Sequence, residues 1–221
     1  MACWSAENAT RAYLKTMKMG TRAKEPNVAE FVSALAAGNN AQLMVVASAN
    51  ATCSSTTLAL VAAAHQTGGR VVCILTGTEE LCLSAKALGL DARRVEFVIG
   101  EAQSLLMNDY READFVVIDC NLKNHERIFK AVEEGKRHNG TVVLGYNAFC
   151  NDSWSWGGSK TQLLPIGEGL LLTRIAAKAK VGGGGGGSFR KRSHWVVKVD
   201  KCTGEEHVFR VRSPQMKVIE G

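Results

Sequence analysis

One stretch, residues 42–77, limits the fold more than any other part of the chain: QLMVVASANATCSSTTLALVAAAHQTGGRVVCILTG. It contains an apolar run at 42–47, a loop of small residues, a helical pattern at 54–66, a Gly-Gly turn and a second apolar run at 71–75. Neither run alternates with polar residues, which is typical of parallel strands covered on both faces. Because a strand–helix–strand unit crosses over right-handedly, this stretch predicts the opening of a nucleotide-cofactor fold.

The alternation of strands and helices continues along the chain. Apolar runs predict further strands at 95–99, 115–119 and 141–145, with a helix between the last two and a polar turn after residue 99. Two amphipathic helices are predicted within residues 1–38. Either both cover one edge of the sheet, or the first forms a lid over a cofactor. We therefore expect an α/β, Rossmann-like fold of three layers with a mostly parallel sheet.

The composition changes near residue 180. We expect an α/β domain at 1–180, a glycine-rich linker at 181–188 and a basic C-terminal segment at 189–221. SHWVVKV and EHVFRVR alternate around DKCTGE, which predicts a β-hairpin. The hairpin either adds a strand pair to the edge of the sheet or is a tethered module.

The net charge of +6 is concentrated in this last segment, because residues 188–221 hold eight Lys/Arg and four Asp/Glu. The basic run Arg190, Lys191 and Arg192 could contact phosphates, but such short runs are usually solvated or act as a nuclear address. We therefore do not expect nucleic-acid binding.

Other features exclude further classes of protein. No apolar run reaches the length of a membrane span, and residues 1–20 lack the apolar centre of a signal peptide. The seven cysteines include no C-x-x-C pair, so we expect reduced thiols and no zinc site. These observations favour a cytoplasmic protein, or a nuclear one if the basic run is an address, with no membrane partner.

Polar or small residues stand at the carboxyl end of each predicted strand. Parallel strands place their carboxyl ends at one edge of a sheet, where ligands of such folds bind. Hydroxyl groups and the N-terminus of the following helix can hold an anion there. The residues at this rim are Ser48, Thr76, Glu101, Asp119 and Asn147.

Four blocks carry a resemblance to a known family: VEFVIGEAQSLL, DFVVIDCNLKNH, GTVVLGYNAF and LLPIGEGLLLTRI. In this order they resemble class I S-adenosylmethionine-dependent methyltransferases of the catechol and caffeoyl-CoA O-methyltransferase type, over roughly residues 26–176. The whole chain, with its start WSAENATRAYLKT, also resembles an uncharacterised plant family of methyltransferase-like proteins. The resemblance implies a seven-stranded sheet with one antiparallel strand, S-adenosylmethionine as cofactor, a small-molecule acceptor and a possible homodimer.

The resemblance also implies which residues bind the cofactor. The first loop, ASANATCSS, has neither the glycines nor the carboxylate of the family's E-x-G-x-x-x-G. Leu75 or Thr76 takes the place of the family's ribose-binding carboxylate. Gly100-Glu101-Ala102 resembles the family's adenine-side Gly-Asp-Ala. The implied cofactor-binding residues are Ser48, Ala49, Asn50, Ser55, Thr76, Glu101, Ala102 and Asp119.

The resemblance implies candidate catalytic or metal-binding roles for three residues. Asp119 matches a metal-binding carboxylate of the family, and Asn147 takes the place of a second ligand. One carboxylate and one amide make a weak oxygen site, so we expect no divalent metal. Asp119 and His125 are then the candidate catalytic residues, with His125 as base. The alternative for His125 is a solvated residue in the first turn of a helix.

Two classes of function follow. The first is small-molecule O-methyl transfer from S-adenosylmethionine without a full metal site. The alternative is a catalytically inactive Rossmann-like protein with a binding or regulatory role, a pseudo-methyltransferase.

Overall fold

The computed structural model describes residues 4–19, 28–49, 54–135, 140–150, 161–177, 193–199 and 206–212. The chain divides into two compact units, Met1–Ala179 and Lys180–Gly221. We describe each unit by itself.

The first unit is built on a seven-stranded sheet in the order β3-β2-β1-β4-β5-β7-β6. All neighbours pair in parallel except β7, which is antiparallel to both β5 and β6. This is the predicted mostly parallel sheet with one antiparallel strand. The strands are β1 (Leu43–Ala47), β2 (Arg70–Leu75), β3 (Val95–Ile99), β4 (Phe115–Asp119), β5 (Thr141–Tyr146), β6 (Thr161–Leu164) and β7 (Leu170–Ile175).

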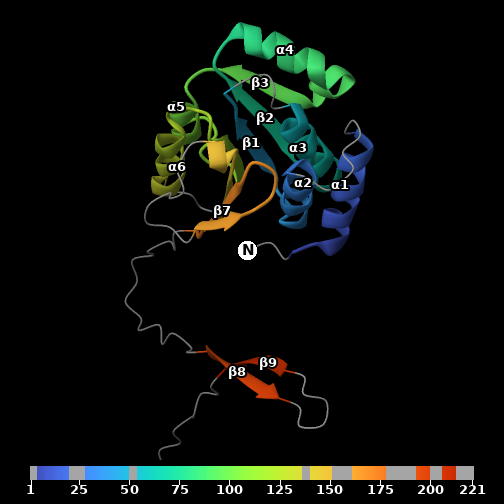
Figure 1. The fold of residues 1–221 in the computed structure, drawn as a ribbon, viewed down its shortest axis with the longest axis vertical. Helices are drawn as coiled ribbons and strands as arrows, with labels where there is room; N and C mark the ends of the chain where they lie inside the picture. Colours follow the sequence, from blue (N-terminus) through green and yellow to red (C-terminus); the bar gives the residue numbers. More distant parts are fainter. Residues whose placement is uncertain are drawn as a thin grey trace, which may run out of the picture. The chain divides into compact units, whose positions relative to one another are not determined.

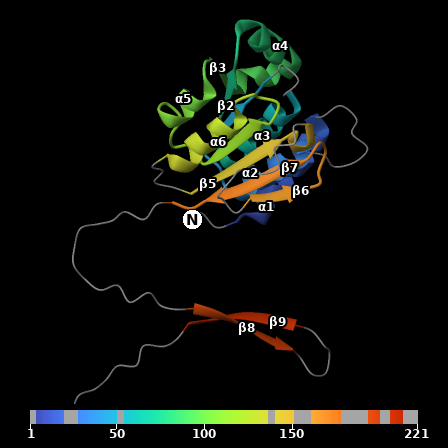
Figure 2. The same cartoon turned by 60° about the vertical axis from the view of Figure 1, so that its left-hand side comes forward.

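Helices cover both faces of this sheet (Figure 1). Helices α1 to α4 lie on one face and α5 and α6 on the other, as the turned view in Figure 2 also shows. The helices are α1 (Ala6–Met19), α2 (Val28–Gly38), α3 (Ser54–Thr67), α4 (Thr78–Leu88), α5 (Ala102–Met107) and α6 (His125–Glu134), with short 3₁₀ turns η2 (Gly89–Arg94) and η3 (Ala148–Cys150). Gly100 and Glu101 form a short turn after β3, as predicted, and helix α5, which the sequence analysis did not predict, begins at Ala102.

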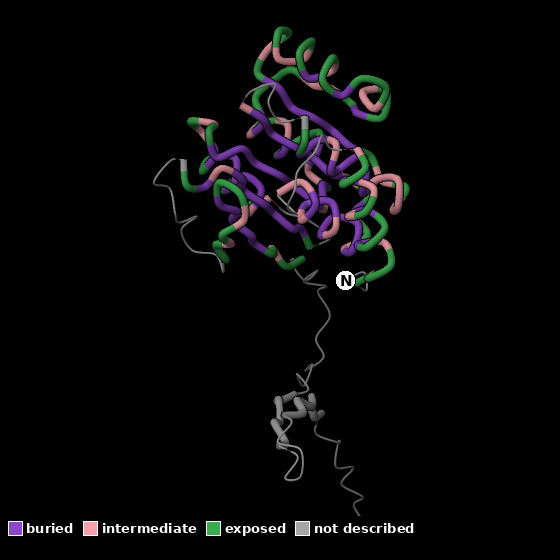
Figure 3. Tube along the Cα trace, turned by 45° about the vertical axis from the view of Figure 1, so that its right-hand side comes forward, coloured by how far each residue is buried: buried purple, intermediate pink, exposed green. Residues whose placement is uncertain are grey.

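Two apolar cores result from the pleat of the strands. Met44 and Val46 of β1 belong to the core under α1 to α4, whereas Val45 and Ala47 belong to the core under α5 and α6. All four are fully buried, and Figure 3 shows the strands of the sheet as the buried centre of the unit. Burial on both faces explains why the strands are apolar without alternation.

The Gly68-Gly69 turn sets β2 beside β1. Gly68 has φ of 73°, a conformation that glycine adopts without strain. A Cβ on Gly69 would lie 2.6 Å from the carbonyl oxygen of Ala41, so no larger residue fits. The turn lets the Arg70 N–H donate to the Gln42 carbonyl at 2.7 Å, which starts the pairing of the two strands.

Asp114 joins the starts of the three central strands. Its carboxylate accepts the backbone N–H groups of Gln42 at 2.8 Å and Leu43 at 3.1 Å. Its backbone carbonyl accepts the N–H of Val142 at 2.9 Å. Partial burial raises the pKa of this carboxyl, and the hydrogen bonds from Gln42 and Leu43 oppose that rise. One residue thus aligns β1, β4 and β5.

The second unit contains β8 (Ser193–Val199) and β9 (Glu206–Arg212). They pair antiparallel, with Ser193 opposite Arg212 and Val199 opposite Glu206. The predicted hairpin is therefore present, with its two strands paired in a two-stranded sheet. The predicted glycine-rich linker and the run at 190–192 lie outside the described residues.

Within the part of the chain that is described, no helix has the length and apolar character needed to cross a membrane.

The role of Asp114 can be tested by Asp114→Asn. An amide keeps one acceptor oxygen but turns an NH₂ group toward the second backbone N–H, so we expect a loss of about 1–3 kcal/mol in the free energy of unfolding. Urea denaturation measures this loss. Asp109→Asn, at an exposed position, is the control. Equal effects of the two substitutions would contradict the strand-aligning role.

Candidate functional site

A cavity lies at the carboxyl edge of the parallel strands, where ligands of such folds bind. Its volume is about 140 Å³, and it is bounded by the ends of β1 and β2 and by the starts of α5 and α6. The lining residues are Ala47, Ser48, Ile74, Leu75, Thr76, Gly100, Glu101, Ala102, Leu122, Asn124 and Ile128.

Four of the predicted cofactor residues meet in this lining: Ser48, Thr76, Glu101 and Ala102. Three others, Ala49, Ser55 and Asp119, do not line it, and Asn50 lies outside the described residues. The structure thus brings together the ends of three strands, as the parallel order predicts. Cofactor binding by these residues stays a prediction.

The lining has an apolar interior and a polar rim. Ile74, Leu75 and Ile128 are buried and supply apolar walls. Thr76 and Glu101 are exposed at the rim. The Ser104 hydroxyl donates to Oε2 of Glu101 at 2.8 Å, which fixes the carboxylate at the start of α5. A ligand with a flat apolar part and a hydroxyl-bearing part fits this arrangement chemically.

Asp119 is buried, with 2% of its surface exposed, and its carboxylate accepts hydrogen bonds from three segments. The donors are the N–H of Ala49 at 3.3 Å, the N–H of Asn121 at 3.0 Å and Nδ2 of Asn147 at 3.0 Å. These bonds satisfy a carboxylate that burial would otherwise make costly. Asp119 therefore ties together the chain after β1, β4 and β5.

Asn147 contributes a donor to this contact and not an oxygen ligand. Its backbone has φ of 61°, a left-handed conformation that asparagine tolerates better than most residues. Its amide NH₂ group faces the Asp119 carboxylate, so the two predicted weak metal candidates bind each other by a hydrogen bond. Among the described residues no group of three or more His, Cys, Asp and Glu side chains could hold a metal ion.

His125 is buried, with 6% of its surface exposed, so its alternative interpretation as a solvated residue is wrong. Nδ1 lies 2.7 Å from the Leu122 carbonyl. Because a carbonyl only accepts, Nδ1 is the donor of this hydrogen bond. Within the described part of the chain, Nε2 is buried without a hydrogen-bond partner. His125 does not line the cavity, so its role as base stays a prediction.

Sequence reasoning assigned no binding role to Leu122, Asn124 or Ile128, which also line the cavity. They come from the segment that follows β4 and from α6. Asn124 and Ile128 are four residues apart, which places them on one side of a helix. That spacing, next to a strand that ends at the rim, is the signal that could have revealed them.

The comparisons with known proteins bear on this geometry. A family model described as "Protein of unknown function (DUF1442)" matches residues 1–211. The chain belongs to the DUF1442 family. A search of curated proteins finds no match to this DUF1442 chain.

Solved structures share its fold at low sequence identity. A methyltransferase from Geobacter sulfurreducens is 18% identical, with a TM-score of 0.55 over 77% of this chain and 90% of the other. The methyltransferase PaMTH1 of Podospora anserina, solved with SAH bound, is 14% identical, with a TM-score of 0.55 over 80% and 91%. The O-methyltransferase TomG from Streptomyces achromogenes, in complex with SAM, is 16% identical, with a TM-score of 0.50 over 80% and 93%. The DUF1442 chain therefore has the class I methyltransferase fold.

The left-handed backbone at Asn147 can be tested with a matched pair of variants. Asn147→Gly and Asn147→Ala both remove the hydrogen bond to Asp119, but only alanine is strained at positive φ. We expect Asn147→Ala to be less stable than Asn147→Gly by about 1 kcal/mol in urea denaturation. A glycine variant that is equally or less stable would show that the backbone shifts when the amide is lost.

Proposed function

We propose that this DUF1442 protein binds S-adenosylmethionine at the carboxyl-edge cavity and transfers its methyl group to a hydroxyl of a small-molecule acceptor without a full metal site. The observation that carries the proposal is the meeting of Ser48, Thr76, Glu101 and Ala102 around one cavity. This edge is where the strand order reverses, between β1 and β4, and open α/β sheets bind ligands at such a point.

Structural relatives support the choice of cofactor. PaMTH1 was solved with SAH bound and TomG with SAM, and both share the fold of this chain. The resemblance of Gly100-Glu101-Ala102 to the family's adenine-side turn points to the same nucleoside.

The residues of the cavity fit the nucleoside end of this cofactor. Apolar walls suit the two faces of a base. The exposed hydroxyl of Thr76 offers hydrogen bonds to a ribose. The volume of about 140 Å³ is below the roughly 300–1,000 Å³ typical of sites for whole ligands of this size. The described residues therefore enclose one part of the cofactor, which supplies a transferable methyl group when bound.

A specific observation favours a second candidate, a catalytically inactive binding or regulatory protein. Neither Asp119 nor His125 lines the cavity. Asp119 is held by three hydrogen-bond donors, and Nδ1 of His125 is bonded to a backbone carbonyl. An acceptor hydroxyl must lose its proton during transfer, and a base has to reach it. Binding of the cofactor without transfer would fit this arrangement.

Three other features of the proposed enzyme are predictions from the sequence. They are the identity of the acceptor class, a homodimer, and a cytoplasmic or nuclear location.

Calorimetric titration with S-adenosylmethionine and S-adenosylhomocysteine tests the binding step. We expect heat with both ligands and a weakening of about tenfold or more in Thr76→Tyr, because the ring would fill the rim of the cavity. Thr78→Tyr is the control. Thr78 is also exposed and lies two residues further along the chain, but it does not line the cavity.

Two results would contradict the proposal. If millimolar ligand gives neither heat nor a thermal shift, the protein does not bind S-adenosylmethionine and the proposal is wrong. Equal affinity in Thr76→Tyr and in the wild-type chain would show that the cofactor does not bind in the carboxyl-edge cavity. If the ligands bind, transfer of a labelled methyl group to a panel of phenols separates the enzyme from the inactive binding protein.

A further inference from the structure

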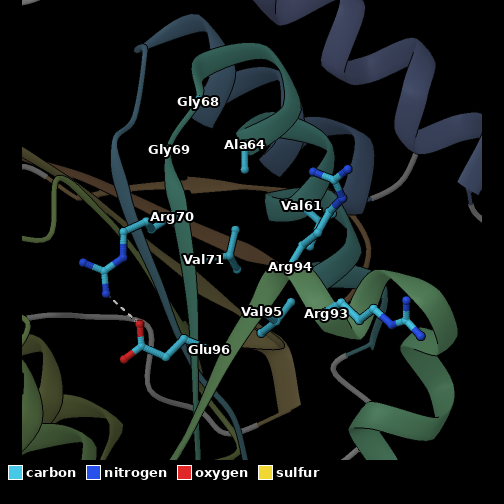
Figure 4. A pocket seen from close by; sticks show the side chains of 10 residues that line it. All are labelled: Val61, Ala64, Gly68, Gly69, Arg70, Val71, Arg93, Arg94, Val95 and Glu96. Carbon is cyan, nitrogen blue, oxygen red and sulfur yellow. Dashed lines mark hydrogen bonds and ion pairs between the residues drawn. The ribbon is translucent and has the colours of Figure 1, made fainter.

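A second and larger cavity lies at the opposite, amino edge of β2 and β3. Its volume is about 520 Å³, within the range of small-molecule sites. It is formed by the C-terminal half of α3, the Gly-Gly turn, the starts of β2 and β3, and η2 (Figure 4). The lining residues are Val61, Ala64, Gly68, Gly69, Arg70, Val71, Arg93, Arg94, Val95 and Glu96.

Three arginines and one carboxylate make up the charged part of this lining. Arg70 forms an ion pair with Glu96 at 2.6 Å, and Glu96 also accepts the hydroxyl of Tyr110 at 2.7 Å. Both hydrogen bonds lower the pKa of Glu96, that from Tyr110 most. The only carboxylate of the lining is thus already paired, and it neutralises Arg70.

Arg93 and Arg94 remain as positive charges of the cavity. Both are exposed, and neither forms an ion pair with a described residue. In Figure 4 they extend on the side away from the Arg70 and Glu96 pair, and their guanidinium groups point in different directions. A guanidinium group presents two parallel N–H donors, which match the oxygens of a phosphate.

Lys15 and His65 lie close enough to Arg94 for its charge to change their pKa values. Burial lowers the pKa of Lys15, and the positive charge of Arg94 lowers it further. Burial also lowers the pKa of His65, followed by the charges of Lys15 and Arg94. Asp91 acts in the opposite direction on both groups but does not cancel the shift. Lys15 and Asp91 are thus the cationic and anionic neighbours of Arg94 on this side of the cavity.

The floor of the cavity is apolar. Val61, Val71 and Val95 are buried, and Ala64 is half-buried beside them. Gly68 leaves the backbone of the turn open, since a Cβ there would meet nothing within 4 Å. An apolar floor with cationic groups at one side suits a ligand that has an apolar part and a phosphate.

We propose that this amino-edge cavity binds a small molecule of nucleotide size that carries two phosphate groups, with these groups on Arg93 and Arg94 and its apolar part against Ala64 and Val95. The site lies at the other end of the strands from the carboxyl-edge cavity, so it does not depend on the proposed methyltransferase function.

The test is calorimetric titration of the full chain at low salt with ADP and with inorganic pyrophosphate. We expect both to bind, ADP more tightly because it also covers the apolar floor. Arg94→Gln and Arg93→Gln should each weaken both by about tenfold or more, since each removes a charged contact. Arg127→Gln, an equal change of charge at an exposed position of α6, should leave both affinities unchanged.

Thr76→Tyr separates the two cavities. ADP affinity that survives in Thr76→Tyr and falls in Arg94→Gln assigns the nucleotide to the amino edge. Affinity lost in Thr76→Tyr alone would place ADP at the other cavity and overturn the proposal. It is also overturned if millimolar ADP and pyrophosphate give no heat, if Arg127→Gln weakens binding as much as Arg94→Gln, or if a short single-stranded DNA binds more tightly than ADP.

Discussion

The structure depends on how the central strand β4 is held at both ends. Its five residues are buried, and it pairs with β1 on one side and β5 on the other. A carboxylate stands at each end of this apolar strand, and each is satisfied by donors from the neighbouring segments. An unpaired carboxylate there would cost several kcal/mol. The hydrogen bonds that satisfy Asp114 and Asp119 are therefore the same bonds that align β4 with the neighbouring segments.

This constraint shapes the carboxyl edge. In many sites of this kind, a rim carboxylate is available to a ligand or a metal. Here Asp119 is used within the protein, by Ala49, Asn121 and Asn147. What the cavity offers to a ligand are the exposed Thr76 hydroxyl and Glu101 carboxylate at its rim and apolar walls. The proposed nucleoside site at this edge therefore has neither Asp119 nor His125 in its lining.

The amino edge has the opposite character. Its one lining carboxylate, Glu96, is held by Arg70 and Tyr110, while Arg93 and Arg94 lie at the end of a short 3₁₀ turn without an ion pair among the described residues. The two edges of the same sheet thus differ in the sign of the charge they leave available. Anionic ligands suit the amino edge, and a neutral or cationic group suits the rim beside Glu101.

The sequence by itself determined the sheet and its layers. Runs such as LMVVA and FVVID are apolar because both of their faces are buried, and this need is local and visible in the residues. It also placed Ser48, Thr76 and Glu101 at one edge, because parallel strands end together. Only the tertiary structure decided that Asp119 is hydrogen-bonded, that His125 is buried, and that Arg70, Arg93 and Arg94 share a cavity. These facts depend on which distant segments pack against a side chain, and no pattern along the chain records that.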